Sequence, residues 1–349
     1  MRSMGKRGKP SRRVRLEDLA QQSGVPVSPA SRALGGGTGV RAEMRAQILE
    51  AAKTLNYAIP ASIADRKVIL AASSVAMVDY VRNQFTFYVL EGLNARAGTL
   101  GVEILTRPIS TRAEEIKVLE EAQANDEVVG CLFLTLDDED MLTATTSFGK
   151  PIVLVNGDDP SMRLSSVTPC NRSAARMATE HLIRLGHERI LFLMRRGRRT
   201  IERRFEGWQD AMRQRGFAGL DELAVDVGDW LPELGAEAIA SRVREKGLDF
   251  TAILTAGDSL AVGAAMGLER LGYKVPDDVS VMGMDDLPQA AFQNPPLTTM
   301  HIPMREIGAA ALNLLLDDLG GFSMPPRRVE LACHLVERRS TGKARKVST

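Results

Sequence analysis

The stretch TAILTAGDSLAVGAAMGLERLGYKVPDDVSVMGMDD, residues 251–286, contains one complete repeating unit of the main fold. Two apolar runs, TAILTA and VSVMGM, predict buried strands, and the segment near 259–271 between them predicts an amphipathic helix. Gly272 follows that helix, where a residue that tolerates positive φ can end it. A strand, a helix and a second strand in this order predict parallel strands covered by helices.

The same alternation runs from Val68 to about residue 320. Further strands are predicted within VILAASSVAMV, VEILT, VVGCLFLT, PIVLV, RILFLM and LAVDV. Further helices are predicted near 86–98, 113–125, 138–148, 172–185, 203–215, 235–247 and 303–318. We therefore expect two doubly wound parallel sheets, over about 69–160 and 161–290, each binding ligands at the carboxyl ends of its strands.

The first 55 residues instead predict a bundle of three helices, of which the last runs from about Ala42 to Leu55. The first, residues 16–23, ends before Gly24, and the second begins with Ser28 as a possible N-cap and Pro29 in its first turn. Helical spacing turns Ala30, Ala33 and Leu34 inward and leaves Val27, Ser28, Ser31 and Arg32 outside. This pattern is typical of a helix-turn-helix whose second helix enters a DNA major groove, with a protein-binding module as the alternative.

Charge is distributed unevenly along the 349 residues. Residues 1–67 contain 13 Lys and Arg against 5 Asp and Glu, a net charge of +8, so the remainder carries −7. A basic segment on an acidic body favours a polyanion as its partner. The sequence shows no apolar segment long enough to span a membrane and no secretory signal, so we expect a cytoplasmic, nucleoid-associated protein.

Enzymatic and metal chemistry find little support in the sequence. GGGTG at 35–39 follows no predicted strand, and GDSLAVGAAMG at 257–267 lacks the dinucleotide spacing and a Walker lysine. His181 and His187 lie on different faces of one helix, as surface and helix-end residues that cannot chelate one ion. The three cysteines are far apart in the sequence, which favours reduced thiols over a disulfide framework or a zinc site. We expect no catalytic residue, no metal and no cofactor.

The head, VRLEDLAQQSGVPVSPASRAL with the spacing through LNYAIP, resembles the LacI/GalR family of transcriptional regulators. The remainder resembles the family's sugar-binding core in RSAARMATEHLIRLGHERILFL, in RRFEGWQDAMRQRG, in residues 251–286, in NPPLTTMHIPMREIGAAALNLLL and in LVERRST. The resemblance covers about Val14 to Thr341. It implies a small all-α helix-turn-helix head followed by an α/β core of two doubly wound subdomains, similar to type I periplasmic binding proteins.

The resemblance also implies the division of the chain. The expected parts are a basic arm (1–13), the DNA-binding domain (14–59), a hinge (60–68), the effector-binding and dimerisation core (69–342) and a tail (343–349). Within the core we expect an N-subdomain of about 69–160 plus 292–320, and a C-subdomain of about 161–291 plus 321–342. The expected DNA-contacting residues are Arg15, Val27, Ser28, Ser31, Arg32, Ile63 and Arg66.

For the effector, the resemblance points to Arg204, whose fork can donate to two hydroxyls or a carboxylate, and to Asp285 at the end of a predicted strand. Phe85, which could stack on a sugar face, Asp158 and Asp258 complete the expected set. The alternatives for these positions are a core aromatic at Phe85, an ordinary helix arginine at Arg204 and a helix N-cap at Asp285.

Three departures from the family pattern qualify these expectations. Gly257 stands where the family usually has Asn, which removes one sugar-bonding amide. Cys170 stands where Asp is usual, and we expect Asn171 still to cap the following helix. Arg66 occupies the position where the family typically has a leucine that inserts between base pairs in the minor groove. Arginine unstacks bases less well than leucine but is suited to a narrow minor groove.

We therefore expect a homodimeric, ligand-responsive repressor of sugar or sugar-acid catabolism or transport genes, with double-stranded operator DNA as its partner. Six arginines between 195 and 204 suggest an acidic effector, such as a sugar acid or sugar phosphate, beside the neutral sugars. The alternative is a solute-binding protein of a transport system, against which the basic head and the absence of a signal peptide argue.

Overall fold

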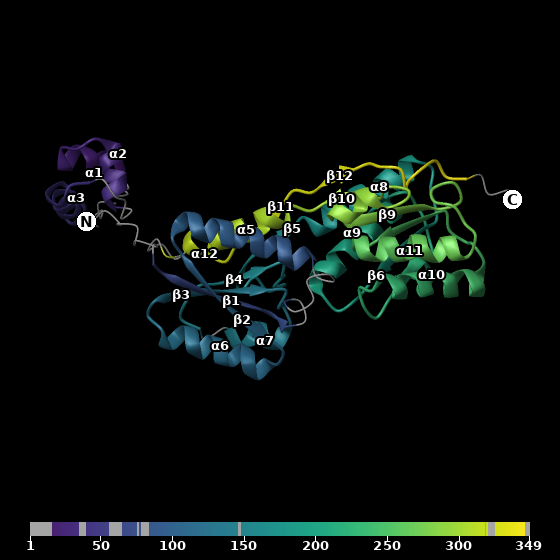
Figure 1. Ribbon diagram of the computed structural model, residues 1–349, viewed down its shortest axis with the longest axis horizontal. Coiled ribbons are helices and arrows are strands. Elements are labelled where there is room, and N and C mark those ends of the chain that lie inside the picture. The colour runs from purple at the N-terminus through teal and green to yellow at the C-terminus, as the bar shows by residue number, and fades with distance from the viewer. Residues whose placement is uncertain are drawn as a thin grey trace, which may run out of the picture.

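The computed structural model describes residues 16–34, 40–55, 65–74, 77, 84–145, 148–317, 319 and 325–345. Its first part is the head, at the left of Figure 1, built from helices α1 (Leu16–Ser23), α2 (Val27–Leu34) and α3 (Ala42–Thr54). The three helices bury a small apolar cluster that contains Leu19, Ala33, Ile48 and Ala52. Such short helices depend on this shared cluster for stability.

Helix α2 begins at Val27, two residues before the start that an N-cap at Ser28 implies. The N–H of Ala30 donates to the carbonyl of Pro26 at 3.1 Å, which makes Val27 the first helical residue. Ser28 therefore lies inside the first turn and is not the N-cap. Pro29 lies in the same first turn. Proline has no backbone N–H, and this costs no hydrogen bond here because N–H groups in the first turn have no acceptor within the helix.

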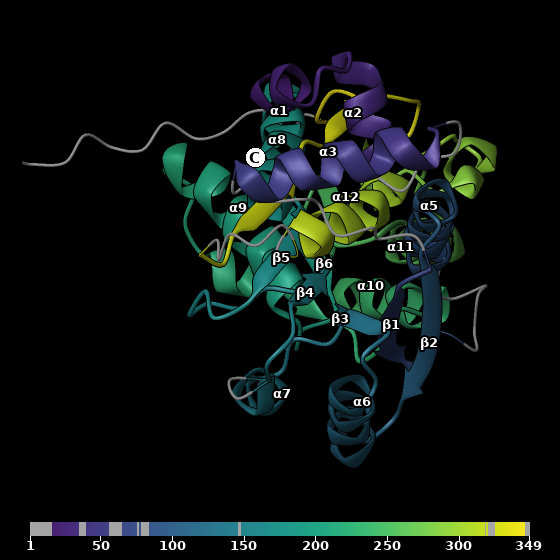
Figure 2. The same ribbon diagram turned by 90° about the vertical axis from the view of Figure 1, so that its left-hand side faces the viewer.

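The first lobe of the core is built on a six-stranded parallel sheet with the order β11-β5-β4-β3-β1-β2. Its strands are β1 (Lys67–Ser73), β2 (Glu103–Ile109), β3 (Val128–Leu134), β4 (Ile152–Val155), β5 (Ser165–Pro169) and β11 (Arg328–Leu331). Helices α5 (Gln84–Leu100) and α12 (Met304–Asp317) cover one face, and α6 (Arg112–Ala124) and α7 (Glu139–Ala144) cover the other (Figures 1 and 2).

Burial along β1 shows why this segment is a central strand. Val68 and Leu70 enter the apolar cluster beneath α5 and α12, whereas the alternate residues Ile69 and Ala71 enter the cluster beneath α6. Successive side chains of a strand point to opposite faces, so a run that is apolar at every position buries both. The predicted parallel sheet covered on two sides is confirmed.

The second lobe contains the sheet β12-β10-β9-β8-β6-β7, parallel except for the antiparallel pair β10–β12. Its strands are β6 (Ile190–Met194), β7 (Ala224–Asp226), β8 (Ala252–Thr255), β9 (Ser280–Asp285), β10 (Thr298–His301) and β12 (His334–Val336). Its helices are α8 (Asn171–Arg184), α9 (Arg199–Gln214), α10 (Pro232–Lys246) and α11 (Asp258–Arg270). Short 3₁₀ turns, η2 (Leu220–Leu223) and η3 (Pro288–Phe292), complete it.

The chain passes between the two sheets three times, after Pro169, after His301 and after Leu331. These crossovers differ from the expected boundaries near 160, 292 and 320. Four strands without a clear pattern in the sequence, β5, β10, β11 and β12, are responsible for the difference. The first three are short and contain Ser, Thr or charged residues, and β12 has only three residues. Pairing with neighbouring strands, not their own hydrophobicity, assigns them to a sheet.

Several predicted elements are shifted at their ends. The first core strand stops at Ser73 instead of continuing to residue 78, and α7 stops at Ala144 instead of 148. Helix α9 begins at Arg199 instead of 203, and α10 begins at Pro232, whose fixed φ suits a first helical position.

The two histidines that were expected at the surface are buried. His187 is 2% exposed and bonds through its ring nitrogens to Thr251 Oγ1 at 2.8 Å and Ser280 Oγ at 3.0 Å. His181 is 4% exposed and bonds to Thr341. Burial lowers the pKa of both rings, so they act as neutral hydrogen-bonding groups of the core.

Helices α5 and α12 approach each other closely through a reciprocal pair of glycines. A Cβ on Gly92 would collide with the carbonyl oxygen of Arg305, and a Cβ on Gly308 would collide with that of Val89. Both obstacles are backbone atoms, which cannot rotate away. The absence of a side chain at these two positions therefore sets the distance between the helices.

We predict that Gly92→Ala lowers the free energy of unfolding by about 1–3 kcal/mol, because α12 must shift to admit the methyl group. Gly98→Ala, on the same helix with open space around it, is the matched control. It should leave stability unchanged or raise it by up to about 1 kcal/mol through helix propensity. Thermal unfolding of both variants measures the difference, and equal melting temperatures would contradict the glycine contact.

Candidate effector site and DNA-binding head

Arg204, on α9, is the centre of a buried polar cluster in the second lobe and is only 4% exposed. Its Nε donates to Asn171 Oδ1 at 2.8 Å, and its Nη1 donates to the carbonyl of Ala256 at 2.5 Å. The same Nη1 lies 3.4 Å from Asp285 Oδ1. Three partners in fixed directions hold the guanidinium in one orientation.

The cluster lies where a parallel sheet offers a ligand site. Asp285 is the last residue of β9, Ala256 follows β8, and Asn171 is the first residue of α8. These are the carboxyl ends of strands and the amino end of a helix, as the sequence analysis expected for this edge. The structure thus brings Arg204 and Asp285 together, although they are 81 residues apart.

Asn171 has a different role from the expected helix cap. The residue before α8, Cys170, makes no side-chain cap, and Asn171 is itself the first helical residue. Its side-chain oxygen accepts from Arg204 instead. Sequence reasoning missed this contact because nothing local to Asn171 indicates that α9 packs against α8.

Asp258 is fully buried, and its carboxylate is already occupied. Oδ2 accepts the N–H of Leu287 at 2.9 Å, and Oδ1 accepts the hydroxyl of Thr299 at 2.6 Å. It ties the loop after β9 and the strand β10 to the start of α11. The structure therefore gives Asp258 a structural position, in contrast to the expected contact with an effector.

Asp258 and Asp285 influence each other's protonation. The N–H of Asp258 donates to Asp285 Oδ2 at 3.3 Å, so the two carboxylates are close. Burial and, secondly, the negative charge of Asp285 raise the pKa of Asp258 to about 7, against the hydrogen bonds from Thr299 and Leu287. Burial also raises the pKa of Asp285, to about 6, against the opposing effect of the Arg204 charge. Two neighbouring buried carboxylates thus titrate near neutral pH.

Trp230 is a site residue that the sequence analysis missed. A Cβ on Gly257 would lie 3.2 Å from the Trp230 ring and 3.2 Å from Asp285 Oδ2. The half-buried indole therefore occupies space beside Asp285, where the family's usual Asn would need room. An indole face next to hydrogen-bonding groups is suited to stacking on a sugar ring. The departure at Gly257 could have signalled a bulky neighbour.

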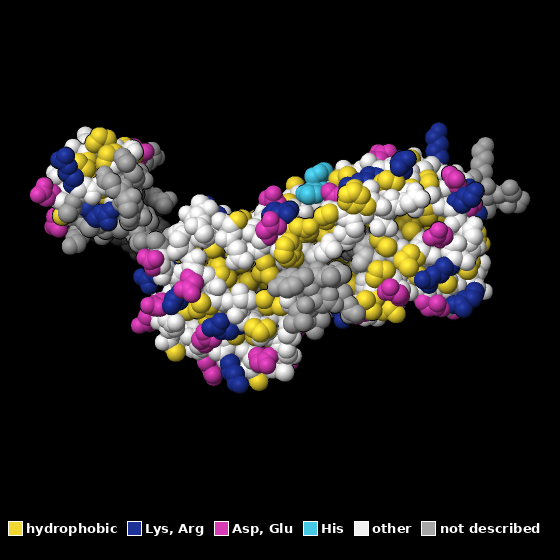
Figure 3. Space-filling model, in the orientation of Figure 1, with side chains coloured by type: hydrophobic (Ala, Val, Ile, Leu, Met, Phe, Trp, Pro, Cys, Tyr) yellow, Lys and Arg dark blue, Asp and Glu magenta, His cyan; other side chains and the backbone are white. Residues whose placement is uncertain are grey.

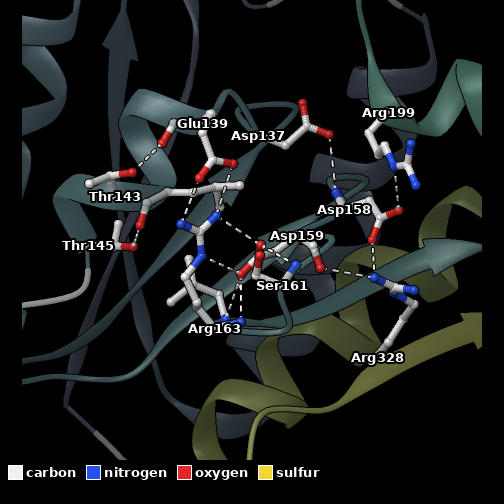
Figure 4. A network of polar contacts seen from close by, with 12 residues as sticks. Asp137, Glu139, Thr143, Thr145, Asp158, Asp159, Ser161, Arg163, Arg199 and Arg328 are labelled. Carbon is white, nitrogen blue, oxygen red and sulfur yellow. Dashed lines mark hydrogen bonds and ion pairs between the residues drawn. The ribbon is translucent and has the colours of Figure 1, made fainter.

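Asp158 follows β4 in the first lobe and is surrounded by arginines. It pairs with Arg328 on β11, with Arg203 at 3.1 Å and with Arg199 at 3.6 Å, as Figure 4 shows in part. Arg199 and Arg203 belong to α9, so these ion pairs join the two lobes. The carboxylate expected to bind the effector therefore serves first as a contact between lobes.

The loop that carries Asp158 is held by a second set of polar contacts (Figure 4). Asp159 accepts from the N–H of Arg163 at 2.6 Å and of Ser161 at 3.0 Å. Arg163 in turn bonds to Glu139 at 2.8 Å. The N–H of Asp158 donates to Asp137 at 3.1 Å. These bonds keep Asp158 directed toward α9.

The six arginines of residues 195–204 do not form a free basic patch. Arg196 pairs with Glu202 at 3.7 Å, and Arg199 and Arg203 share Asp158 and Glu206. Arg195 bonds to the carbonyl of Gly228, and Arg198 bonds to that of Asn156. Most of their charge is compensated within the chain.

Phe85 lies on α5 of the first lobe, half-buried against the main apolar cluster. This packing agrees with the core alternative for Phe85 and leaves part of the ring accessible. A small hollow at the crossovers is lined by Asp158, Asn171, Thr200 and Arg328 among others, and Phe85 is not among its lining residues. Within the described residues no group of His, Cys, Asp and Glu is arranged to hold a metal ion.

The head presents part of the expected DNA-binding surface. Val27 is 41% exposed on α2 and Ser28 is exposed, while Ala30 is buried as predicted. Arg15, Ile63 and the side chains of Ser31 and Arg32 lie outside the described residues. Arg66 is exposed, but its carbonyl accepts the N–H of Glu103, so it is anchored to the first sheet beside β2. This anchorage does not favour insertion into a minor groove.

A three-helix head joined to a two-lobed core with a polar site at its strand ends defines a ligand-responsive, DNA-binding regulator. The family model for the periplasmic binding protein-like domain matches residues 179–341. The HTH-type transcriptional regulator MalR of Streptomyces coelicolor is 32% identical over 95% of this chain and 97% of its own length. The chain belongs to the LacI/GalR family of transcriptional regulators.

Other relatives agree with this assignment. The HTH-type transcriptional repressor PurR of Photobacterium profundum is 26% identical over 93% of this chain and 98% of its own length. A structure of the transcriptional regulator CelR with cellobiose is 27% identical, with a TM-score of 0.71 over 94% of this chain and 100% of its own. A lac repressor dimer bound to operator and the anti-inducer ONPF is 25% identical, with the same TM-score over 95% and 100%.

We predict that the buried pair Asp258–Asp285 makes the protein less stable as pH rises from about 5 to 7. Their pKa values are raised on folding, so the folded state binds more protons than the unfolded state in this range. With pKa values of about 7 and about 6, the loss should amount to roughly 3 kcal/mol over those two pH units.

Asp258→Asn, which retains one acceptor and the side-chain shape, should flatten this dependence. Asp277→Asn, at an exposed aspartate, is the control and should leave it unchanged. Urea unfolding at several pH values measures the slope. Identical slopes for Asp258→Asn and the unsubstituted protein would show that the pair does not titrate in this range.

Proposed function

We propose that this protein is a repressor that binds operator DNA as a homodimer and responds to a neutral sugar bound at Arg204, Asp285 and Trp230. The observation that carries the proposal is the presence, in one chain, of a helix-turn-helix head and the buried Arg204–Asp285 pair at the strand ends of the second lobe. MalR, PurR and the lac repressor, which are named as transcriptional regulators or repressors, support it.

The chemistry of the site favours a polyhydroxy ligand without net charge. The Arg204 guanidinium can donate to hydroxyls while Asp285 accepts from them, and their charges compensate each other. The arginines around 195–203 are mostly paired with carboxylates, which weakens the case for an acidic effector. Trp230 adds an apolar face for the sugar ring. The cellobiose in the CelR structure is an effector of this chemical class.

Operator binding is proposed for the head, with two subunits reading two half-sites. The exposed Val27 and Ser28 on α2 form the described part of a surface that would enter the major groove. Figure 3 shows acidic and basic side chains interspersed on the visible face of the core, whereas residues 1–67, which include the head, carry a net charge of +8. This difference favours the amino-terminal segment as the DNA-contacting part.

The homodimer is supported by apolar side chains exposed on both lobes. Phe292 is 86% exposed and Phe87, on α5, is 45% exposed. Large aromatic side chains at a surface are typical of interfaces. A second copy of the chain is the proposed cover, and no enzymatic activity is proposed.

The proposed coupling runs through α9, which carries both the effector arginine and the contacts to the first lobe. Arg198, at the start of α9, donates to the carbonyl of Asn156, and Arg199 and Arg203 pair with Asp158. An effector that pulls on Arg204 would therefore shift the first lobe, to which the head is joined. Such a shift changes DNA affinity only if the effector prefers one arrangement of the lobes.

We propose a cytoplasmic location for this activity. No helix within the described residues is long and apolar enough to cross a membrane.

One prediction from the proposed function concerns Arg204. We would measure the melting temperature of the protein with each member of a panel of sugars, because a ligand that binds the folded state raises it. The panel contains neutral mono- and disaccharides, with uronic acids and sugar phosphates as the acidic arm. At least one neutral sugar should stabilise the protein, and Arg204→Lys should weaken its binding at least tenfold because the planar fork is lost.

Arg213→Lys, at an exposed arginine on the same helix, is the matched control and should bind normally. Arg195→Gln should also retain the preference for neutral sugars. Binding confined to the acidic arm, or normal binding by Arg204→Lys, would contradict the proposed site.

Another prediction from the proposed function concerns sequence-specific binding of DNA. Selection of bound genomic fragments by the full-length protein should enrich a palindromic motif of two half-sites. Deletion of residues 1–67 should abolish the enrichment, and Val27→Asp should reduce affinity for the motif at least tenfold through repulsion of phosphates.

Ala46→Asp adds the same negative charge at an exposed position on α3 and serves as the control. Enrichment of no motif at any salt concentration would refute the assignment of the head as a specific reader of DNA.

A further inference from the structure

Cys170 and Cys333, which are 163 residues apart, lie side by side at two of the three crossovers between the lobes. Cys170 follows β5 and precedes α8, and Cys333 lies between β11 and β12. The N–H of Cys333 donates to Cys170 Sγ at 3.3 Å, and the N–H of Cys170 donates to the carbonyl of Leu331 at 2.9 Å. Strand pairing, which places Pro169 opposite Leu331, creates this contact.

The surroundings of Cys170 favour its thiolate. The backbone N–H of Cys333 donates to Cys170 Sγ at 3.3 Å, and Cys170 stands at the positive amino end of α8. The Cys333 thiol lies beside it and donates to the carbonyl of Leu331 at 3.8 Å. The interactions with Cys333 lower the pKa of Cys170 to about 6, against burial and the negative charge of Glu330. The pKa of Cys333 is raised by its bond to Cys170 and by burial, against the positive charge of Arg204.

Exposure divides the pair into two chemical roles. Cys170 is only partly buried and is the more accessible of the two thiols to an oxidant, whereas Cys333 is 7% exposed. A low-pKa, accessible thiolate beside a second thiol is the arrangement that supports reversible oxidation. The third cysteine, Cys131, is fully buried in β3, and burial raises its pKa to about 12.

We propose that Cys170 and Cys333 form an oxidant-sensitive dithiol whose disulfide joins two of the three crossovers. The backbone N of Cys333 lies 3.3 Å from Cys170 Sγ, so the two residues are in contact just beyond the ends of β5 and β11. Disulfides join such neighbours at Cα separations of about 4.4–6.8 Å. Closing the bond requires the Cys333 thiol to turn from the carbonyl of Leu331 toward Cys170 Sγ.

The oxidant is a hydroperoxide, and the reaction has two steps. The Cys170 thiolate attacks one peroxide oxygen, the O–O bond breaks, and the leaving oxygen takes a proton and departs as water or an alcohol, which leaves a sulfenic acid. Cys333 sulfur then attacks the Cys170 sulfur, the S–O bond breaks, and hydroxide leaves as water with the Cys333 proton. In total the two thiols lose two electrons, and the hydroperoxide gains these two electrons.

The disulfide would act on the effector site through the adjacent residue. Cys170 directly precedes Asn171, which holds Arg204 at 2.8 Å. A covalent link across two crossovers also restricts rotation of one lobe against the other, since a hinge must absorb backbone changes at these positions. This consequence rests on the proposed function, whereas formation of the disulfide does not.

The test uses the full-length, reduced protein treated with hydrogen peroxide, followed by alkylation and peptide mass mapping. Two of the three thiols should become unreactive, with one peptide pair linked through Cys170 and Cys333 that dithiothreitol releases. Cys131→Ser should form the same link, and Cys170→Ser and Cys333→Ser should form none within the chain. Melting temperatures of the reduced variants establish that each is folded.

Three free thiols after treatment, or links only between chains, would overturn the proposed dithiol. The coupling to the effector site is read separately, from the binding of the sugar identified in the melting screen by oxidised and reduced protein. At least a threefold change in affinity is expected for the unsubstituted protein and none for Cys333→Ser. A disulfide that forms without changing affinity would overturn the coupling alone.

Discussion

The structure of the core depends on one constraint, which is that the chain passes between two parallel sheets at three neighbouring places. The crossovers follow β5, β10 and β11, so each lobe is completed by segments distant in the sequence. Because parallel strands end at a common edge, their terminal residues converge there. The proposed ligand site, the ion pairs between lobes and the cysteine pair all lie near this edge.

The contacts of Arg204 show how the polar groups at the strand ends are stabilised. A buried guanidinium is costly unless its charge and its donors are satisfied. Here Asp285 supplies the charge, and Asn171 and the carbonyl of Ala256 accept its hydrogen bonds. The four groups come from different elements of the second lobe. The arrangement keeps a charged donor ready for a ligand without a free charge in the core.

The contacts between the lobes are of a different kind from those inside each lobe. Asp158 meets Arg199, Arg203 and Arg328 through ion pairs, whereas each sheet is buried by apolar side chains on both faces. Because Asp158 is buried, its ion pairs must exchange partners or become hydrated when the lobes move, whereas packed apolar layers shift only as units. In the proposed coupling the lobes are therefore the rigid bodies, and the crossovers with the Asp158 contacts are the part that rearranges.

The three-helix head and the two doubly wound sheets could be predicted from the sequence alone, because hydrophobic periodicity is a local property. Arg204 and Asp285 were indicated by the resemblance to the LacI/GalR family. Only the tertiary structure assigned β5, β10, β11 and β12, whose short polar segments become strands by pairing with neighbours. It also placed Asp258 in the core, Trp230 beside Gly257 and Cys170 beside Cys333. These contacts join residues far apart in the chain, and no local pattern encodes which distant residue will occupy the space next to another.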